Sequence, residues 1–96
     1  MYAKGQGVEQ NFAEAIRWFR RAAEQGLAMA QANLGTMYAS GQGVKQNLVL
    51  AYMWLSLAAN QDDKEAAELR DQVAPRMTPV QIAEAQKLAR EWKPKK

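Results

Sequence analysis

Residues 34–47 read LGTMYASGQGVKQN, and the last ten of these letters have a near copy at residues 2–11, which read YAKGQGVEQN. The two copies are 36 positions apart. When residues 1–25 are placed over residues 37–61, 14 positions hold the same residue, the tryptophans at 18 and 54 among them. A fixed period in the thirties is typical of proteins built from stacked repeats. The repeat therefore indicates the architecture before any local motif is considered.

Composition narrows the class of protein. With 96 residues, of which 48% are hydrophobic and 24% charged, the chain has room for one folded domain. Its longest apolar run, residues 48–59 around Ser56, is shorter than the roughly 20 residues that a transmembrane helix needs. The formal net charge is +3, and three positive charges come from the lysines of the tail at residues 93–96. No stripe of basic and aromatic residues occurs elsewhere in the sequence. We therefore expect neither membrane insertion nor nucleic-acid binding.

Turn and cap signals divide the chain. The two Gly-x-Gly-Val motifs, at residues 5–8 and 41–44, predict turns, because glycine adopts the positive φ that lets a helix stop and reverse. Asn11 and Asn47 follow these turns as expected N-caps, with Glu14 completing a capping box for Asn11. Gly26 is expected to end a helix, and Gly35 to let a neighbouring backbone approach closely.

Hydrophobic periodicity places the helices. Apolar spacing predicts helices over residues 12–24, 28–40 and 48–60. The charged positions Glu14, Arg17 and Arg21 of the first copy become Leu50, Met53 and Leu57 in the second. Helix 48–60 therefore has an extra apolar face that needs a cover, which the downstream chain can supply.

Two further helices are predicted downstream. Asp62 and Glu65 suggest a capping box for a helix over residues 63–74, which Pro75 ends. Thr78, Pro79 and Gln81 are a strong start signal for a last helix that runs to about Trp92. The prediction is an all-α fold: an α/α superhelix (solenoid) of antiparallel helix pairs, with about five helices and a C-terminal capping helix. Its expected parts are residues 1–26 as a partial repeat lacking its first helix, 27–62 as a complete repeat, 63–92 as a degenerate terminal repeat with the capping helix, and 93–96 as a basic tail.

One set of residues resembles a known family. The set comprises Ala30, Gln31, Asn33, Leu34, Gly35, Tyr38, Gly41, Gly43, Val44, Asn47, Ala51, Trp54, Ala58 and Ala59. It resembles the Sel-1-like repeat, a relative of the tetratricopeptide repeat, over residues 1–61, and residues 62–92 resemble the degenerate terminal segment of that family. The resemblance implies a right-handed superhelix that acts as a scaffold for protein–protein contacts, often in bacterial signalling, envelope or host-interaction proteins. A cysteine-rich, secreted branch linked to penicillin binding is disfavoured, because this chain has no cysteine.

Residue types argue against catalysis. Histidine and cysteine are absent, which removes the commonest general base, thiol nucleophiles and most zinc sites. Ser40 and Ser56 have no candidate base partner. The Gly-x-Gly pairs lack the Lys-Ser/Thr of a phosphate loop. We therefore predict no enzyme activity, no metal and no cofactor.

The resemblance also suggests where a partner binds. By analogy with the tetratricopeptide relatives, the first helix of each pair lines the concave side, and this set would be Met29, Ala32, Asn33, Thr36, Ala39 and Ser40. Asn33 can bond an extended backbone, and Met29 offers an adaptable apolar contact. Glu65, Glu68 and Gln72 would add an acidic edge in the next pair. Each of these residues is explained equally well as ordinary surface.

The amino end favours self-association. Because residue 1 aligns with residue 37, the first pair lacks its leading helix, and Tyr2, Ile16 or Trp18 should be partly uncovered. Such groups favour a homodimer, whereas the alternative is a fragment of a longer array whose missing helix covers them. A third interpretation is a self-associating structural spacer.

These observations predict a non-catalytic scaffold that binds a partner protein or peptide. The alternative is an accessory or regulatory module in bacterial cell-envelope or peptidoglycan metabolism. Localisation stays open between the bacterial cytoplasm and, if a signal precedes Met1, the periplasm or the exterior.

Overall fold

The structure is a computed structural model that describes residues 4–94, with the side chains of residues 14–94. Its elements are α1 (Lys4–Glu24), α2 (Ala28–Ser40), α3 (Leu48–Ala59), α4 (Lys64–Val73), the short 3-10 turn η1 (Ala74–Arg76) and α5 (Pro79–Glu91). The described part of the chain contains no strand, so the predicted all-α class and the five helices are confirmed.

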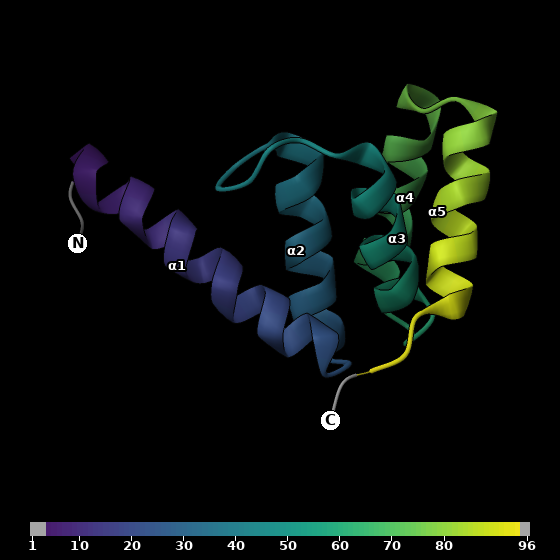
Figure 1. Cartoon of the computed structure of the whole chain (residues 1–96), viewed down its shortest axis with the longest axis horizontal. Coiled ribbons are helices and arrows are strands. Elements are labelled where there is room, and N and C mark those ends of the chain that lie inside the picture. Colours follow the sequence, from purple (N-terminus) through teal and green to yellow (C-terminus); the bar gives the residue numbers. More distant parts are fainter. Residues whose placement is uncertain (1–3, 95–96) are drawn as a thin grey trace.

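The helices follow one another as antiparallel neighbours. Figure 1 shows α2, α3, α4 and α5 side by side, running alternately in opposite directions, while α1 crosses the lower end of α2 and projects beyond the other helices. Helix α3 is central, because it packs against α2, α4 and α5. Helix α1 packs mainly against α2. This arrangement is a short helical solenoid whose first helix is covered on one side.

Two apolar clusters hold the helices together. The first joins the second half of α1 to α2 and α3 through the buried residues Ile16, Ala23, Ala30, Leu34, Tyr38, Ala51, Met53, Trp54 and Leu57. The second joins α3, α4 and α5 through Leu55, Ala58, Ala66, Val73, Met77 and Ala85. Leu88, Ala89 and Trp92 of the α5 region pack on the first cluster. The predicted C-terminal cover for the apolar face of α3 is therefore confirmed.

Gly35 allows α2 and α3 to approach closely, as predicted. A Cβ atom at this position would lie 2.8 Å from Leu55 Cγ and 3.1 Å from the carbonyl oxygen of Ala51. Real Cβ contacts are not this short, so any side chain here would push the two helices apart.

The turn at residues 41–44 forms as predicted. Gly41 and Gly43 both have φ of 77°. The turn is attached to α2, because the amide of Gly41 donates to Met37 O at 2.7 Å and the amide of Asn47 donates to Tyr38 O at 3.0 Å. The Asn47 side chain then caps α3 by accepting from the amide of Leu50.

The predicted turn at residues 5–8 is wrong, because these residues lie inside α1. Asn11 is accordingly an interior helical residue and not an N-cap. In the second copy the turn is held by the carbonyls of Met37 and Tyr38 in the preceding helix, and the residues equivalent to these acceptors, 1 and 2, lie outside the described residues. A continuous helix instead pairs backbone groups within the segment itself.

Two positions 36 residues apart end α1 and α3 in the same way. Gly26 has φ of 98°, and Asp62, the equivalent residue, has φ of 72°. The N-cap of α4 is consequently Asp63, whose carboxylate accepts from the amide of Ala66. The predicted capping box on Asp62 is therefore wrong by one residue. The box on Thr78 and Gln81 at the start of α5 is confirmed in both of its hydrogen bonds.

Candidate protein-interaction surfaces

One side of α2 presents an exposed row of side chains, Met29, Asn33, Thr36 and Ser40, hereafter the α2 row. Met29 is 72% exposed. Tyr38, nine residues later, is about two and a half turns away and so projects from the opposite side, where it is buried in the first cluster. The structure thus places these four predicted partner-binding residues on one open surface, while the other two, Ala32 and Ala39, are half-buried.

Hydrogen bonding limits what the α2 row can offer. Thr36 Oγ1 donates to Ala32 O at 2.9 Å, and Ser40 Oγ donates to Met37 O at 3.4 Å, so both hydroxyl protons are used within the helix. Asn33 makes no side-chain hydrogen bond within the described residues. The free amide of Asn33 and the apolar side chain of Met29 are therefore the strongest contact groups of the row.

A small groove of about 180 Å³ runs beside the α2 row, between α2, α3 and α4. It is lined by Thr36, Ala39, Leu55, Leu69, Gln72, Val73 and Arg76. Thr36 and Gln72 occupy equivalent repeat positions, so matching faces of α2 and α4 form the two walls. The exposed Glu65 and Glu68 lie on the first turns of α4, and Arg76 lies beyond its end. The α4 wall is therefore acidic at one end and basic at the other.

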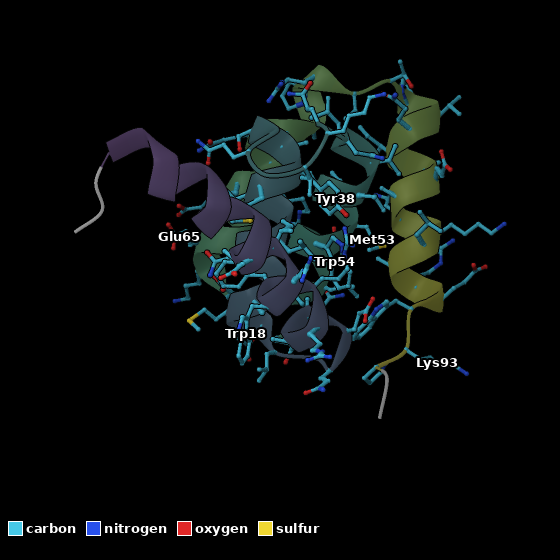
Figure 2. The ribbon with its side chains drawn as sticks, turned by 60° about the vertical axis from the view of Figure 1, so that its left-hand side comes forward. Trp18, Tyr38, Met53, Trp54, Glu65 and Lys93 are labelled. Atoms are coloured by element: carbon cyan, nitrogen blue, oxygen red, sulfur yellow. The ribbon has the colours of Figure 1, made fainter. Side chains whose placement is uncertain are left out.

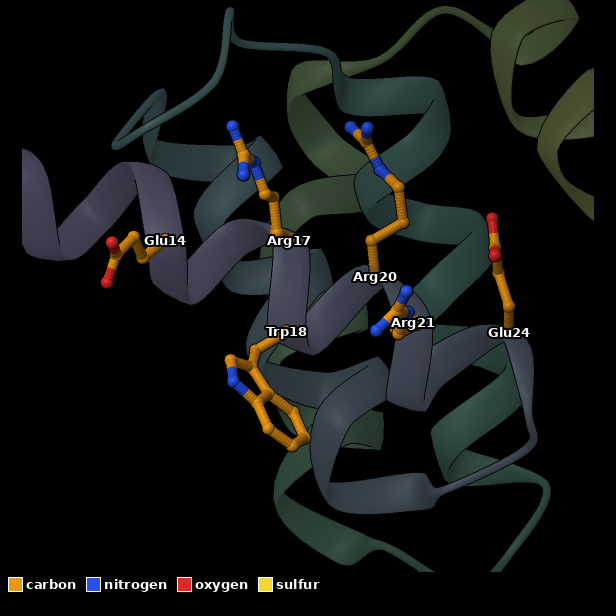
Figure 3. A pocket seen from close by; sticks show the side chains of 6 residues that line it. All are labelled: Glu14, Arg17, Trp18, Arg20, Arg21 and Glu24. Carbon is orange, nitrogen blue, oxygen red and sulfur yellow. The ribbon is translucent and has the colours of Figure 1, made fainter.

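A second surface lies on α1, on its side remote from the core. It is an open depression along the helix, lined by Glu14, Arg17, Trp18, Arg20, Arg21 and Glu24, with a volume of about 540 Å³ (Figure 3). Trp18 is 71% exposed, more than any other described aromatic residue. In Figure 3, which looks onto this face of α1, Trp18 projects along one edge of the face and Arg17 and Arg20 along the other.

Arg20 is fixed by a contact that the sequence did not indicate. Its Nη2 donates to the hydroxyl of Tyr38 at 2.9 Å, which ties α1 to α2. Beside this pair is an open depression, lined by Arg20, Tyr38, Val44, Lys45, Gln46 and Asn47. The repeat equivalents of Arg20 and Tyr38 are Ser56 and Ala74, which cannot form the same hydrogen bond. The repeat therefore does not predict this bond.

The predicted self-association residues have different environments. Trp18 is exposed, as expected. Ile16 is only 7% exposed and belongs to the first cluster, so the expectation that it is uncovered is wrong. Ile16 lies seven residues before the buried Ala23, on the same face of α1, and α2 covers both. Tyr2 lies outside the described residues.

The two repeat-equivalent tryptophans differ sharply. Trp54 is only 7% exposed, as predicted for a core residue, and its neighbours Met53 and Leu57 are also buried. Figure 2 shows Met53 and Trp54 toward α5 (yellow), whereas Trp18 lies away from it on α1. The difference arises because α5 packs on this face of α3, while no described helix covers the matching face of α1.

A pair of side-chain amides, the buried Gln31 and the exposed Gln61, was also missed from the sequence. Gln31 is 0% exposed, and its Nε2 donates to Ala23 O at 3.2 Å. Gln61 Nε2 donates to Gln31 Oε1 at 3.0 Å and to Gly26 O at 2.8 Å. The pair joins the ends of α1 and α3 to the first turn of α2. The sequence clue to this pair was the glutamine repeated at positions 25 and 61. Helical periodicity alone does not predict the hydrogen-bond partner of such a residue.

Two kinds of feature are absent from the described part of the chain. No group of three or more potential metal-ligating side chains occurs within residues 14–94. Among the described helices, none combines the length and apolar character needed to cross a membrane.

Antiparallel helix pairs with a 36-residue period, held by matching turns, define a helical-repeat protein. A family model described as Sel1 repeat matches residues 1–27 and 28–63, about two thirds of the chain. The chain therefore belongs to the Sel1 repeat family, whose repeats are generally helical, non-catalytic modules for protein–protein interaction. The second match begins at Ala28, where α2 also begins. A comparison with curated proteins gives no significant match.

Proposed function

We propose that the chain is a non-catalytic binding module that holds a segment of a partner protein along the α2 row and the adjacent groove. The observation that carries this proposal is the row itself. Four side chains spaced along one face of α2 are exposed beside a groove whose opposite wall is the equivalent face of α4. A surface formed by equivalent faces of successive repeats is the kind of extended site that solenoids use.

The surface favours an extended segment with one apolar anchor. Met29 can adapt to an aliphatic or aromatic side chain, since its thioether chain is flexible. The Asn33 amide can both donate to and accept from a peptide backbone. The groove beside Leu69 is too small for a drug-sized ligand, which usually needs at least about 300 Å³, but it accommodates one side chain.

The charges at the ends of the α4 wall would orient this segment. Glu65 and Glu68 favour a basic residue at one end, and Arg76 favours an acidic residue at the other. A segment that runs in the reverse direction would place like charges together. The partner expected here is therefore a short segment with a basic end, a central apolar residue and an acidic end.

The test is a selection of peptides from a random phage-displayed library on the whole chain, followed by calorimetry with the selected peptides. Asn33→Arg and Thr36→Arg place a large cation on the α2 row, and each should weaken binding by roughly tenfold or more. Gln86→Arg, an exposed change on α5, is the matched control and should leave the affinity unchanged. The proposal would be contradicted if Asn33→Arg and Thr36→Arg bound the selected peptides as tightly as the unaltered chain and the Gln86→Arg control do.

A further inference from the structure

We propose that the outer face of α1 is a self-complementary surface through which two copies of this chain pair as antiparallel helices. The surface is formed by Glu14, Arg17, Trp18 and Arg21, hereafter the α1 stripe. It goes beyond the proposed binding of a partner segment, because it lies on a different helix from the α2 row.

The stripe has the spacing and exposure of a helix contact. Its members follow at i, i+3, i+4 and i+7, so they lie along one face of α1. All four side chains are exposed, and Glu14, Arg17 and Arg21 make no hydrogen bond or ion pair within the described residues. These exposed side chains line an open depression on the side of α1 remote from the core, so a second helix can approach this face.

The chain itself shows how this face behaves when it is covered. The equivalent positions on α3 are Leu50, Met53, Trp54 and Leu57, and a helix, α5, packs against that face. The α1 stripe keeps the tryptophan but replaces the three aliphatic side chains by one acid and two bases. A helix that covers the stripe must therefore offer complementary charges and an apolar contact for Trp18.

A second copy of α1 meets this requirement when it runs antiparallel. With the two-fold axis midway between residues 17 and 18, Glu14 of one copy lies level with Arg21 of the other, and the reciprocal pair forms by symmetry. Trp18 of each copy then lies beside Trp18 of the other, on the same side of the pair. The interface therefore gains two opposite-charge pairs and one aromatic contact from a single helix face, against one repulsion between the two Arg17 side chains near the axis.

The parallel arrangement is disfavoured by the same charges. It would set Glu14 against Glu14 and Arg21 against Arg21, so that every charged position of the stripe meets its own sign. Within one copy, Arg17 and Arg21 are also like charges at i and i+4, a spacing that weakens a helix. A carboxylate from a second copy beside Arg21 relieves this repulsion, which further favours the antiparallel pair.

The experiment is sedimentation equilibrium of the whole chain, from low micromolar to hundreds of micromolar. The expected result is a monomer–dimer equilibrium for the unaltered protein. Glu14→Arg and Arg21→Glu each replace two attractive pairs by two repulsive ones and should raise the dimer dissociation constant by roughly tenfold or more. The double variant Glu14→Arg with Arg21→Glu restores opposite charges and should return the constant to near its original value.

Sedimentation equilibrium also serves for a control variant altered outside the α1 stripe. Glu84→Arg reverses an exposed charge on α5 and should not change dimerisation. Circular dichroism should show unchanged helicity for every variant, because all the altered side chains are exposed. The proposal is overturned by a wild-type monomer at the highest concentration, by a dimer that is indifferent to Arg21→Glu, or by a charge-swapped double variant that stays as weak as the single ones.

Discussion

The indole of Trp92 meets the indole of Trp54 edge-on, with ring centroids 6.0 Å apart and an angle of 72° between the planes. Trp92 is the C-cap residue of α5, and Trp54 is buried on α3. The contact closes the first apolar cluster on the side of α5. Trp18, the repeat equivalent of Trp54, has no such cover. The chain therefore offers the same residue type at buried, half-buried and exposed positions.

These environments predict graded effects on stability. Trp54→Ala should lower the free energy of unfolding by about 3–5 kcal/mol, because it leaves a cavity between α3 and α5. Trp92→Ala should cost about 1.5–3 kcal/mol, since less surface is lost together with the edge-on contact. Trp18→Ala should change it by less than about 0.5 kcal/mol in the monomer. Urea denaturation at low concentration measures all three, and equal losses for Trp18→Ala and Trp54→Ala would rule out the exposed position of Trp18.

The amide pair of Gln31 and Gln61 supports a second prediction. Gln31→Leu keeps a similar side-chain volume but removes the acceptor for Gln61 Nε2 and the donor to Ala23 O. Gln61 retains Gly26 O as an acceptor, and Ala23 O retains the amide of Gly26 as a donor, so the expected loss is that of two hydrogen bonds, about 1–3 kcal/mol in total. Gln86→Leu, on the exposed face of α5, is the control. Hydrogen exchange should show faster opening of the residue 25–27 connection in Gln31→Leu, and unchanged exchange there would mean that the pair does not hold the helix ends.

Structural features that depend on residues within one helix or one turn could be predicted from the sequence. The caps at Asn47 and Thr78 and the turn at Gly41 each depend on groups within a few residues. The close approach at Gly35 and the cover supplied by α5 were also predicted, because an unpaired apolar face requires a neighbour.

Features that depend on a neighbouring helix could not be predicted from the sequence. The Gly-x-Gly motif at residues 5–8 has the same letters as the second motif, yet its backbone continues as a helix. The repeat alignment led to the expectation that Ile16 is uncovered, but α2 covers it. The hydrogen bond between Arg20 and Tyr38 joins side chains 18 residues apart, and helical periodicity cannot reveal such a pair. The proposed binding surfaces depend on partners, so they stay predictions.

Gly41 carries the third prediction. Its φ of 77° is strained for any residue with a Cβ, and β-branched residues tolerate it least. Gly41→Val should therefore destabilise the fold by about 1–3 kcal/mol, and Gly41→Ala by somewhat less. Gln42→Val, one position along the same exposed turn, has no positive φ to maintain and is the control. For a domain of this size, thermal denaturation should show a melting temperature lowered by about 4–8 °C for each kcal/mol; a melting temperature for Gly41→Val equal to that of the control would contradict the strained turn.

Arg17 provides the last prediction, because its equivalent on α3, Met53, lies buried under α5. In the proposed antiparallel pair, the two Arg17 side chains lie near the axis and repel each other. Arg17→Leu removes this repulsion and adds apolar surface beside Trp18, so the dimer dissociation constant should fall by roughly threefold to tenfold. Lys87→Leu also replaces an exposed basic side chain by leucine, but on α5. This control separates the effect at the α1 stripe from non-specific hydrophobic association. Sedimentation equilibrium should show tighter pairing for Arg17→Leu alone, whereas equal tightening in both variants would mean that added hydrophobicity, and not the α1 stripe, causes the association.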